Sequence, residues 1–276
     1  MGTAEREFDL VVYGAASFVG KILCRYLVDR HGVDGDVNWA LAGRNQVKLD
    51  AVNDDLATSL PTIIADAVDK SAVQAMADRT KVVCSTVGPY ALYGSDLVAA
   101  CAASGTHYCD LTGEPQWIRR MIDAHASTAA ETGARIVHAC GFDSIPSDLG
   151  VRFTQSQAME SLGKHCHQIR MGVKSMKGGF SGGTVASMMN VFREGAGDPE
   201  VRKMLQNPYG ICPPEHRAGV RQPNVTQPVY DSHLKRWLAP FVMASINTRI
   251  VHRTHALAGH PYGSDFLYDE STLMSS

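Results

Sequence analysis

The stretch that decides the fold is FDLVVYGAASFVGK, residues 8–21. Its first six residues form a short apolar run rich in β-branched side chains, which predicts a buried strand over 8–13. Apolar side chains then recur at helical spacing over 18–28, with Lys21, Arg25 and Asp29 on the other side. A strand, a glycine-containing loop and a helix in immediate succession are typical of a loop that binds the pyrophosphate of a dinucleotide.

Each small residue of this loop has a physical purpose in such a site. Gly14 permits the tight turn, and Gly20 allows the helix to pack closely on the strand. Ser17 stands where a glycine is usual; it is small and can donate a hydrogen bond. The helix start adds free N–H donors and a positive dipole end, and the alternative is a purely structural turn. The predicted cofactor-binding positions here are Gly14, Ala15, Ser17, Phe18, Val19 and Gly20.

The alternation of strand and helix continues to about residue 140. Six short buried strands separated by helices imply parallel βαβ units and hence an α/β, Rossmann-type, doubly wound parallel sheet. Such sheets bind ligands beyond the carboxyl ends of their strands. The further predicted strands cover residues 37–42, 61–66, 82–87, 107–111 and 135–139, and the further predicted helices cover 46–57, 71–77, 96–103 and 115–131.

The pattern changes after about residue 150. Residues 168–176 alternate like a half-exposed strand, 184–193 have helical spacing, and 241–251 are compatible with one more strand. Residues 195–235 are rich in Gly, Pro and polar side chains, which indicates a long surface excursion or a disordered segment. The C-terminus shows no closing element. We therefore expect a dinucleotide-binding domain over 1–150 and a smaller, incomplete α/β substrate or dimerisation domain over 151–276.

Two residues after the second and third strands bear on the choice of dinucleotide. Arg44 lies where an acidic residue would hold the ribose 2′-hydroxyl of NAD, and an arginine there fits the 2′-phosphate of NADP. The alternative is a solvated arginine at a strand end. Asp66 follows the third strand, where it can accept a hydrogen bond from the adenine amino group or cap the next helix.

The loop after the fourth strand contains Gly88, Pro89 and Tyr90. In this architecture the loop passes near the nicotinamide half of the cofactor, so Gly88 and Pro89 are predicted cofactor contacts. Gly-Pro is equally compatible with a simple strand terminator. Tyr90 is predicted either to line the substrate or to pack under the ring.

Composition excludes several other classes. The chain has 276 residues, with 26 Lys and Arg against 28 Asp and Glu, for a formal net charge of −2. Because phosphate affinity comes chiefly from clustered cations, nucleic acid is not expected as a partner. The seven cysteines contain no CxxC pair, the N-terminus has no apolar signal core, and no apolar stretch reaches about 18 residues. We expect a cytoplasmic protein, with peripheral contact at the plasma membrane left open.

Six segments occur in an order that points to a family: YGAASFVGK, LAGR, STVGPYALYG, YCDLTGE, HACGFDSIPSDLG and KGGFSGGTVASM. Together they resemble the saccharopine dehydrogenase-like oxidoreductases, most closely the actinobacterial trans-acting enoyl reductase branch. The resemblance is dense through about residue 190. It implies an NADP-type Rossmann domain followed by an α/β substrate domain, and the reduction of a polyketide-derived double bond in glycolipid synthesis. Family members are usually longer, which implies that part of the second domain is absent here.

Enoyl reduction needs a hydride, a proton and stabilisation of an enolate oxygen. A carboxylic acid can supply the proton where burial raises its pKa, although such acids also cap helices and hold loops. With Tyr90, we take Asp143 and Lys177 as the predicted catalytic residues. The wider set of candidates is Tyr108, Asp110, Glu114, Asp143, Ser144, Asp148 and Lys177.

Two further patterns have competing interpretations. The KGGFSGGT segment can form an anion nest, or it is a flexible connection in which Thr184 caps a helix. His252, His255 and His260 lack a nearby Cys or carboxylate in sequence, so no metal site is predicted.

Three functions follow in order. The first is an NADP(H)-dependent enoyl reductase acting on a small-molecule or carrier-bound acyl substrate, with a homodimer left open. The second is a saccharopine-type amino-acid dehydrogenase that acts on a C–N bond. Its substrate carries several carboxylates and would need basic side chains such as Arg170, Lys174 and Lys177. The third is a cofactor-binding protein without catalysis.

Overall fold

The computed structural model describes residues 6–177, 179 and 182–274. The chain divides into two compact units. The first comprises Met1–Cys140 with Ser181–Asn190, and the second comprises Gly141–Phe180 with Val191–Ser276. The assignment of an NADP-binding function to residues 1–150 and of a substrate or dimerisation function to 151–276 stays a prediction.

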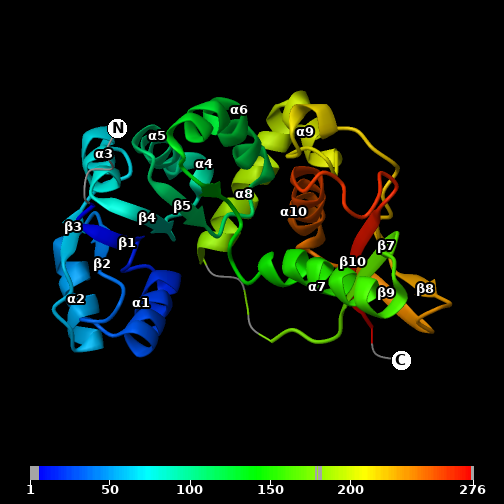
Figure 1. Ribbon diagram of the computed structural model, residues 1–276, viewed down its shortest axis with the longest axis horizontal. Helices are drawn as coiled ribbons and strands as arrows, with labels where there is room; N and C mark the ends of the chain where they lie inside the picture. Colours follow the sequence, from blue (N-terminus) through cyan, green and yellow to red (C-terminus); the bar gives the residue numbers. More distant parts are fainter. Residues whose placement is uncertain (1–5, 178, 180–181, 275–276) are drawn as a thin grey trace. The chain divides into compact units, whose positions relative to one another are not determined.

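The first unit is built on a six-stranded sheet in the order β3-β2-β1-β4-β5-β6, with every neighbouring pair parallel (Figure 1). This is the strand order of a Rossmann fold, and it reverses between β1 and β4. The predicted doubly wound parallel sheet is therefore confirmed. Its strands are β1 (Phe8–Tyr13), β2 (Trp39–Gly43), β3 (Thr62–Ile64), β4 (Thr80–Ser85), β5 (His107–Asp110) and β6 (Ile136–Val137).

Helices connect successive strands, as the spacing of apolar residues predicts. The apolar face of α1 puts Cys24 and Leu27 against Val12 and Leu41 of the sheet, all of them buried. This packing fixes the start of α1 at the end of β1. The helices of this unit are α1 (Phe18–His31), α2 (Gln46–Leu56), α3 (Lys70–Asp78), α4 (Tyr90–Tyr93), α5 (Ser95–Ser104) and α6 (Pro115–Thr132).

The second unit contains a four-stranded sheet in the order β7-β10-β9-β8. β10 pairs in parallel with β7 and antiparallel with β9, so the sheet is mixed. A small core of Val151, Val251, Phe266 and Tyr268 packs within this unit. Its strands and helices are α7 (Ile145–Leu162), β7 (Gln168–Val173), α8 (Gly182–Gly197), α9 (Pro199–Gln206), β8 (Val229–Asp231), β9 (Arg236–Pro240), α10 (Ala244–Leu257) and β10 (Leu267–Leu273), and the division between the units falls within α8.

Several expectations for this second half are wrong. Residues 241–251 are not a strand, because α10 covers Ala244–Leu257. The segment 195–235 contains α9 and β8, so it is not a structureless excursion throughout. The expectation that the C-terminal part adds no closing strand or helix is also wrong, because β10 forms a strand of the second sheet between β7 and β9. The helix α7 was not predicted at all.

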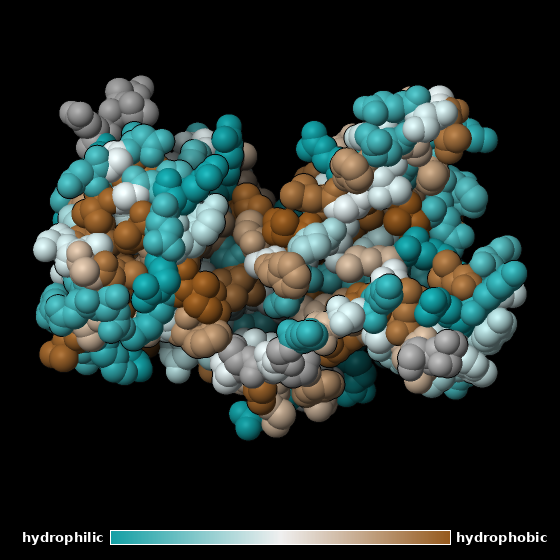
Figure 2. All heavy atoms as spheres, turned by 90° about the horizontal axis from the view of Figure 1, so that it is seen from below, coloured by the Kyte–Doolittle hydropathy of each residue, from teal (hydrophilic) through white to brown (hydrophobic). Residues whose placement is uncertain are grey.

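Buried charge holds this second sheet together. Arg170 on β7 makes an ion pair with Asp269 on β10 at 3.1 Å and another with Asp231 on β8. Asp269 and Asp231 are buried, so the guanidinium compensates two carboxylates that burial alone would destabilise. Apolar side chains still reach the surface among hydrophilic ones (Figure 2).

Candidate functional site

The loop after β1 has the geometry of an anion cradle. Ser17 caps α1, and its hydroxyl accepts a hydrogen bond from the Gly20 N–H at 2.9 Å. The Ser17 carbonyl accepts from the Lys21 N–H at 2.9 Å. In the part of the chain that the structure describes, the N–H groups of Phe18 and Val19 have no protein acceptor. Two donors therefore remain at the positive end of α1 for a ligand oxygen.

The two glycines of the loop are needed for close approach. Gly14 has φ of +88°, and a Cβ there would lie 2.7 Å from Thr86 Oγ1. A Cβ on Gly20 would lie 2.2 Å from the Gly14 carbonyl oxygen, which is backbone that has no rotamer to escape. Ala15 is buried beneath the loop. These contacts support the predicted roles of both glycines.

Thr86 completes the loop, and sequence reasoning missed it. Its hydroxyl donates to the Gly14 carbonyl at 3.0 Å and lies 3.2 Å from the Tyr13 carbonyl. Ser17 Oγ lies 2.9 Å from Thr86 Oγ1. Because the Thr86 proton is used on a carbonyl, Ser17 is the donor in this last bond. The sequence signal that could have identified Thr86 is its position as a polar residue in STVGPY, directly after the fourth strand.

Arg44 stands just beyond β2, exposed, and makes no hydrogen bond or ion pair to another described residue. The buried Tyr13 at the end of β1 interacts with both Arg44 and Asp66. Burial raises the pKa of Tyr13 to about 12; Asp66 adds to this rise and Arg44 opposes it. The ends of β1, β2 and β3 thus bring these three side chains together, and Tyr13 was not predicted.

Asp66 does not cap the next helix, so that alternative is wrong. Its carboxylate accepts from the Val68 N–H at 3.2 Å, which forms a local turn. Asp69 is the N-cap of α3 and accepts from Ser71 and Ala72 N–H at 3.0 and 3.1 Å. The remaining acceptor capacity of Asp66 is available to an adenine amino group.

Tyr90 lies in the core, 4% exposed. Its hydroxyl donates to the Ser85 carbonyl at 3.0 Å and accepts from the Leu111 N–H at 3.4 Å. Burial raises the pKa of this phenol, and the ring lies 5.5 Å from that of Trp117. This geometry argues against proton donation by Tyr90 and for a role in holding the Gly88-Pro89 loop.

Glu114 also holds the loop that contains Gly88 and Pro89. Its carboxylate accepts from the N–H groups of Tyr90 and Ala91 at 2.7 and 3.2 Å, and from Ser187 Oγ at 2.9 Å. Glu114 is fully buried, so these charge-assisted bonds are stronger than bonds between neutral groups. The candidate acid Glu114 is therefore the anchor of α4.

The carboxylate of Asp110 is likewise occupied by partners within the protein. One carboxylate oxygen accepts from the Tyr108 hydroxyl at 2.9 Å and lies 2.7 Å from His138 Nδ1. The other accepts from Thr112 and Ala139 N–H at 3.1 and 2.9 Å. Four partners around a buried carboxylate join the exits of β5 and β6. Asp110 and Tyr108 thus hold loops, the alternative that the sequence left open.

The candidates after β6 belong to the second unit. Asp143 and Lys177 are exposed. Ser144 is buried and donates to Asn247 Oδ1 at 2.8 Å. Burial raises the pKa of Asp148, although Thr254 donates to its carboxylate at 2.9 Å. Asp148 thus combines partial burial with a raised pKa.

The glycine-rich segment after Lys177 is described only in part, because residues 178, 180 and 181 lie outside the described residues. The anion-nest interpretation therefore stays a prediction. α8 begins at Gly182, so Thr184 lies within its first turn and is not its N-cap. Within the described ranges, no group of three or more His, Cys, Asp or Glu side chains can hold a metal ion.

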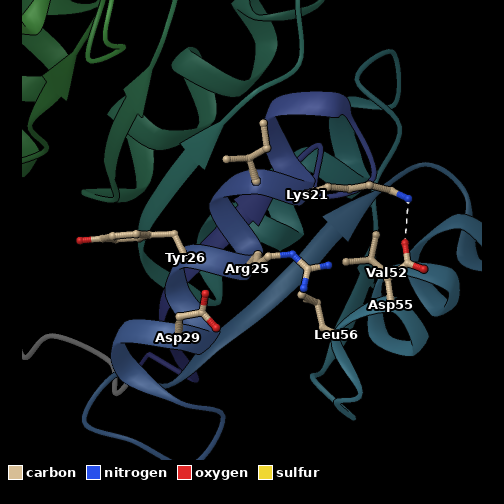
Figure 3. Close-up of a pocket in the computed structure, with 8 residues that line it drawn as sticks. Lys21, Arg25, Tyr26, Asp29, Val52, Asp55 and Leu56 are labelled. Carbon is tan, nitrogen blue, oxygen red and sulfur yellow. Dashed lines mark hydrogen bonds and ion pairs between the residues drawn. The ribbon is translucent and has the colours of Figure 1, made fainter.

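A groove of about 330 Å³ lies between α1 and α2 (Figure 3). Lys21 and Arg25 reach from α1 toward α2, where Lys21 Nζ meets Asp55 at 3.0 Å, while Tyr26 points to the opposite side. None of the predicted cofactor-binding residues lines this groove. It is separate from the strand ends at which a doubly wound sheet binds its ligand.

The strand order, the cradle at the start of α1 and the free arginine after β2 define a dinucleotide-binding domain of the Rossmann type. The saccharopine dehydrogenase NADP binding domain family matches residues 10–137, which lie within the first unit. A trans-acting enoyl reductase from Mycobacterium tuberculosis strain H37Rv is 46% identical over 288 aligned residues, which cover 100% of this chain and 67% of that protein.

The trans-acting enoyl reductase of Mycobacterium ulcerans strain Agy99 is 40% identical, with 98% of this chain and 66% of that protein covered. The chain belongs to this family of NADP-dependent oxidoreductases and spans about two thirds of the length of these relatives. Saccharopine dehydrogenase from Saccharomyces cerevisiae, a solved structure, has a TM-score of 0.46 at 18% identity, over 56% of this chain and 32% of that one. The predicted family and cofactor class are confirmed.

No helix within the described residues is long and apolar enough to cross a membrane.

Proposed function

We propose that this chain is an NADPH-dependent enoyl reductase that reduces the C=C bond of an acyl intermediate held by a carrier. The observation that carries the cofactor half of this proposal is the unpaired Arg44 beside a cradle with two free N–H donors. The names of the relatives support the reaction. A lipid or polyketide intermediate of glycolipid synthesis is the proposed substrate class.

Each residue of the proposed cofactor site binds a different part of the cofactor. The N–H groups of Phe18 and Val19 bind the pyrophosphate, and Arg44 binds the 2′-phosphate. Asp66 accepts from the adenine amino group. Gly88 and Pro89, held by Glu114 through α4, line the nicotinamide side. When bound, the nicotinamide supplies the hydride.

The proton must come from a group that reaches the substrate. Asp143 and Lys177 are exposed and remain the proposed donors, and the raised pKa of Asp148 adds a third candidate. Tyr90 fits this role poorly, because both sides of its hydroxyl are used in the core. Contact with a membrane surface and a homodimer stay predictions.

An ion-pair network occupies one of the basic side chains that the C–N dehydrogenase alternative would use. That reaction needs free basic side chains for substrate carboxylates. Arg170 is held by Asp269 and Asp231, so it is not available for a substrate.

The test is a titration of the purified chain with NADPH and NADH, followed by nicotinamide fluorescence. We expect a preference for NADPH that falls about 10- to 100-fold in Arg44→Ala, the size of one or two charge-assisted hydrogen bonds. Arg25→Ala is the matched control, because Arg25 is exposed in the α1–α2 groove. Equal affinity for the two cofactors in the unaltered chain would contradict the cofactor assignment.

The reaction is tested separately. Consumption of NADPH driven by an α,β-unsaturated acyl thioester is expected, and consumption driven only by a keto acid together with an amino acid would overturn the enoyl reductase proposal.

A further inference from the structure

Four of the seven cysteines gather in the first unit around one strand. Cys84 on β4 interacts electrostatically with Cys24 on α1, with Cys109 on β5 and with Cys140 beyond β6. All of them are free thiols. No step of the proposed reaction uses a thiol, so this cluster calls for an explanation of its own.

Within the cluster, Cys84 and Cys109 form a pair. They are direct partners in the parallel pairing of β4 with β5, and the Cys109 thiol hydrogen-bonds to Cys84. Neighbouring strands lie about 4.8 Å apart, and disulfide bonds span Cα separations of roughly 4.4–6.8 Å. The two sulfurs can therefore be joined without a change of strand register.

Neither residue of this pair is fully buried. Cys84 and Cys109 are partly exposed, whereas Cys24, Cys101 and Cys212 are buried. Val137, the partner of Cys109 on β6, is 50% exposed, so this edge of the sheet is open on the same side. The hydrogen bond from Cys109 lowers the pKa of Cys84, whereas burial raises the pKa of Cys24 to about 12.

We propose that Cys84 and Cys109 are a peroxide-sensitive dithiol whose oxidation to a disulfide weakens cofactor binding. The Cys84 sulfur attacks one oxygen of hydrogen peroxide, the O–O bond breaks, and water leaves after taking up a proton. The Cys109 sulfur then attacks the resulting sulfenic acid, the S–O bond breaks, and the thiol proton leaves with the second water. Two thiols and one peroxide give one disulfide and two waters.

The link to the cofactor runs along β4 and rests on the proposed function. Cys84 lies two residues before Thr86, whose hydroxyl ties together Ser17 and the Gly14 carbonyl. A disulfide draws β4 toward β5 at Cys84 and so disturbs the position of Thr86 beneath the loop. We expect the affinity for NADPH to fall about fivefold, the size of one disturbed hydrogen bond.

The experiment treats the fully reduced chain with one to ten equivalents of hydrogen peroxide, then blocks free thiols with N-ethylmaleimide. Mass spectrometry of the peptides identifies any disulfide, and NADPH fluorescence measures affinity before and after dithiothreitol. Cys84→Ser and Cys109→Ser remove the pair. Cys166→Ser is the matched control, since Cys166 is a partly exposed cysteine of the second unit.

We expect a Cys84–Cys109 disulfide, a fivefold weaker affinity that dithiothreitol restores, and no such change in the two pair variants. A disulfide that uses Cys140, or oxidation without any disulfide, would overturn the assignment of the pair. A Cys84–Cys109 disulfide with unchanged affinity would overturn the link to the cofactor. Because peptide mapping needs no cofactor, a failure of the reduced chain to bind NADPH refutes the proposed function and leaves the disulfide test intact.

Discussion

The Gly20→Ala substitution tests the phosphate loop most directly. The added Cβ would lie 2.2 Å from the Gly14 carbonyl oxygen and 2.8 Å from that of Ala15. Real Cβ contacts are at least 3.0 Å, so the start of α1 must move away by about 0.8 Å. Because both obstacles are backbone atoms, no side chain can rotate to make room.

This displacement has two costs. Overpacking of this kind destabilises by about 1–3 kcal/mol. The movement also lengthens the 2.9 Å bond from the Gly20 N–H to Ser17 Oγ, and loss of an N-cap costs about 1 kcal/mol. We therefore expect the free energy of unfolding of the first unit to fall by about 2–4 kcal/mol. The N–H groups of Phe18 and Val19 move with the helix, so NADPH affinity should fall about 10- to 100-fold.

Urea unfolding measured by tryptophan fluorescence reports mainly on this unit, because Trp39 and Trp117 are buried in it, whereas Trp237 of the second unit is 52% exposed already in the folded state. Gly150→Ala in α7 is the matched control. A Cβ at Gly150 meets nothing within 4 Å, so alanine there should stabilise the second unit by about 0.5–1 kcal/mol. A Gly20→Ala chain with an unchanged unfolding midpoint and unchanged NADPH affinity would refute the account of the loop.

Three further predictions concern buried groups. His252 is 2% exposed, and burial lowers its pKa to about 4 from 6.5. A base whose pKa is lower in the folded state stabilises the fold fully above pH 6.5, so the free energy of unfolding of the second unit should fall by about 3 kcal/mol as the pH falls to 4. The midpoint of urea unfolding is measured against pH for the unaltered chain and for His252→Gln. Parallel pH profiles of the two midpoints would count against this prediction. Asn247→Leu should cost about 2–3 kcal/mol, because it removes the donor that lies 3.0 Å from the buried Glu270; calorimetry measures the loss, and an unchanged melting temperature would exclude a role for this network. Tyr90→Phe should lower stability by about 1 kcal/mol and leave turnover within tenfold; a loss of turnover beyond about 100-fold would restore Tyr90 as a catalytic residue.

The first unit could be predicted almost completely from the sequence, and the reason is physical. Parallel strands are buried on both faces, so each is a short apolar run that ends at a glycine or a polar residue. FDLVVY before Gly14 is the clearest case. The sixth strand is predicted over 135–139 and observed only at Ile136–Val137. The sequence therefore predicts that a strand exists more accurately than it predicts where the strand begins and ends.

In the second half of the chain, the strand predicted over 168–176 and the helix predicted over 184–193 are confirmed as β7 and α8. Other elements escaped prediction because they do not follow the apolar patterns. β10 carries Asp269, Glu270 and Ser271, all buried. Arg170 compensates the first carboxylate, and Asn247 and Tyr268 satisfy the second. These partners come from β7 and α10 or from β10 itself, so the strand reads as polar until the fold is known. α10 was mistaken for a strand because its β-branched residues outweighed the helical spacing of its buried side chains.

The segments in which this chain resembles its family are of two kinds. In one kind the polar groups are hydrogen-bonded within the protein, and in the other they have no partner among the described residues. In YCDLTGE, the side chains of Asp110 and Glu114 are occupied by internal partners, so this segment holds the exits of β4, β5 and β6 in place. In YGAASFVGK and LAGR, the N–H groups of Phe18 and Val19 and the guanidinium of Arg44 are without protein partners in the described residues. A buried carboxylate with all its acceptors used gains little from a ligand, whereas a free donor at a helix start gains a full charge-assisted bond. We therefore expect the second kind of segment to bind the cofactor, whereas the first kind holds the loops in position.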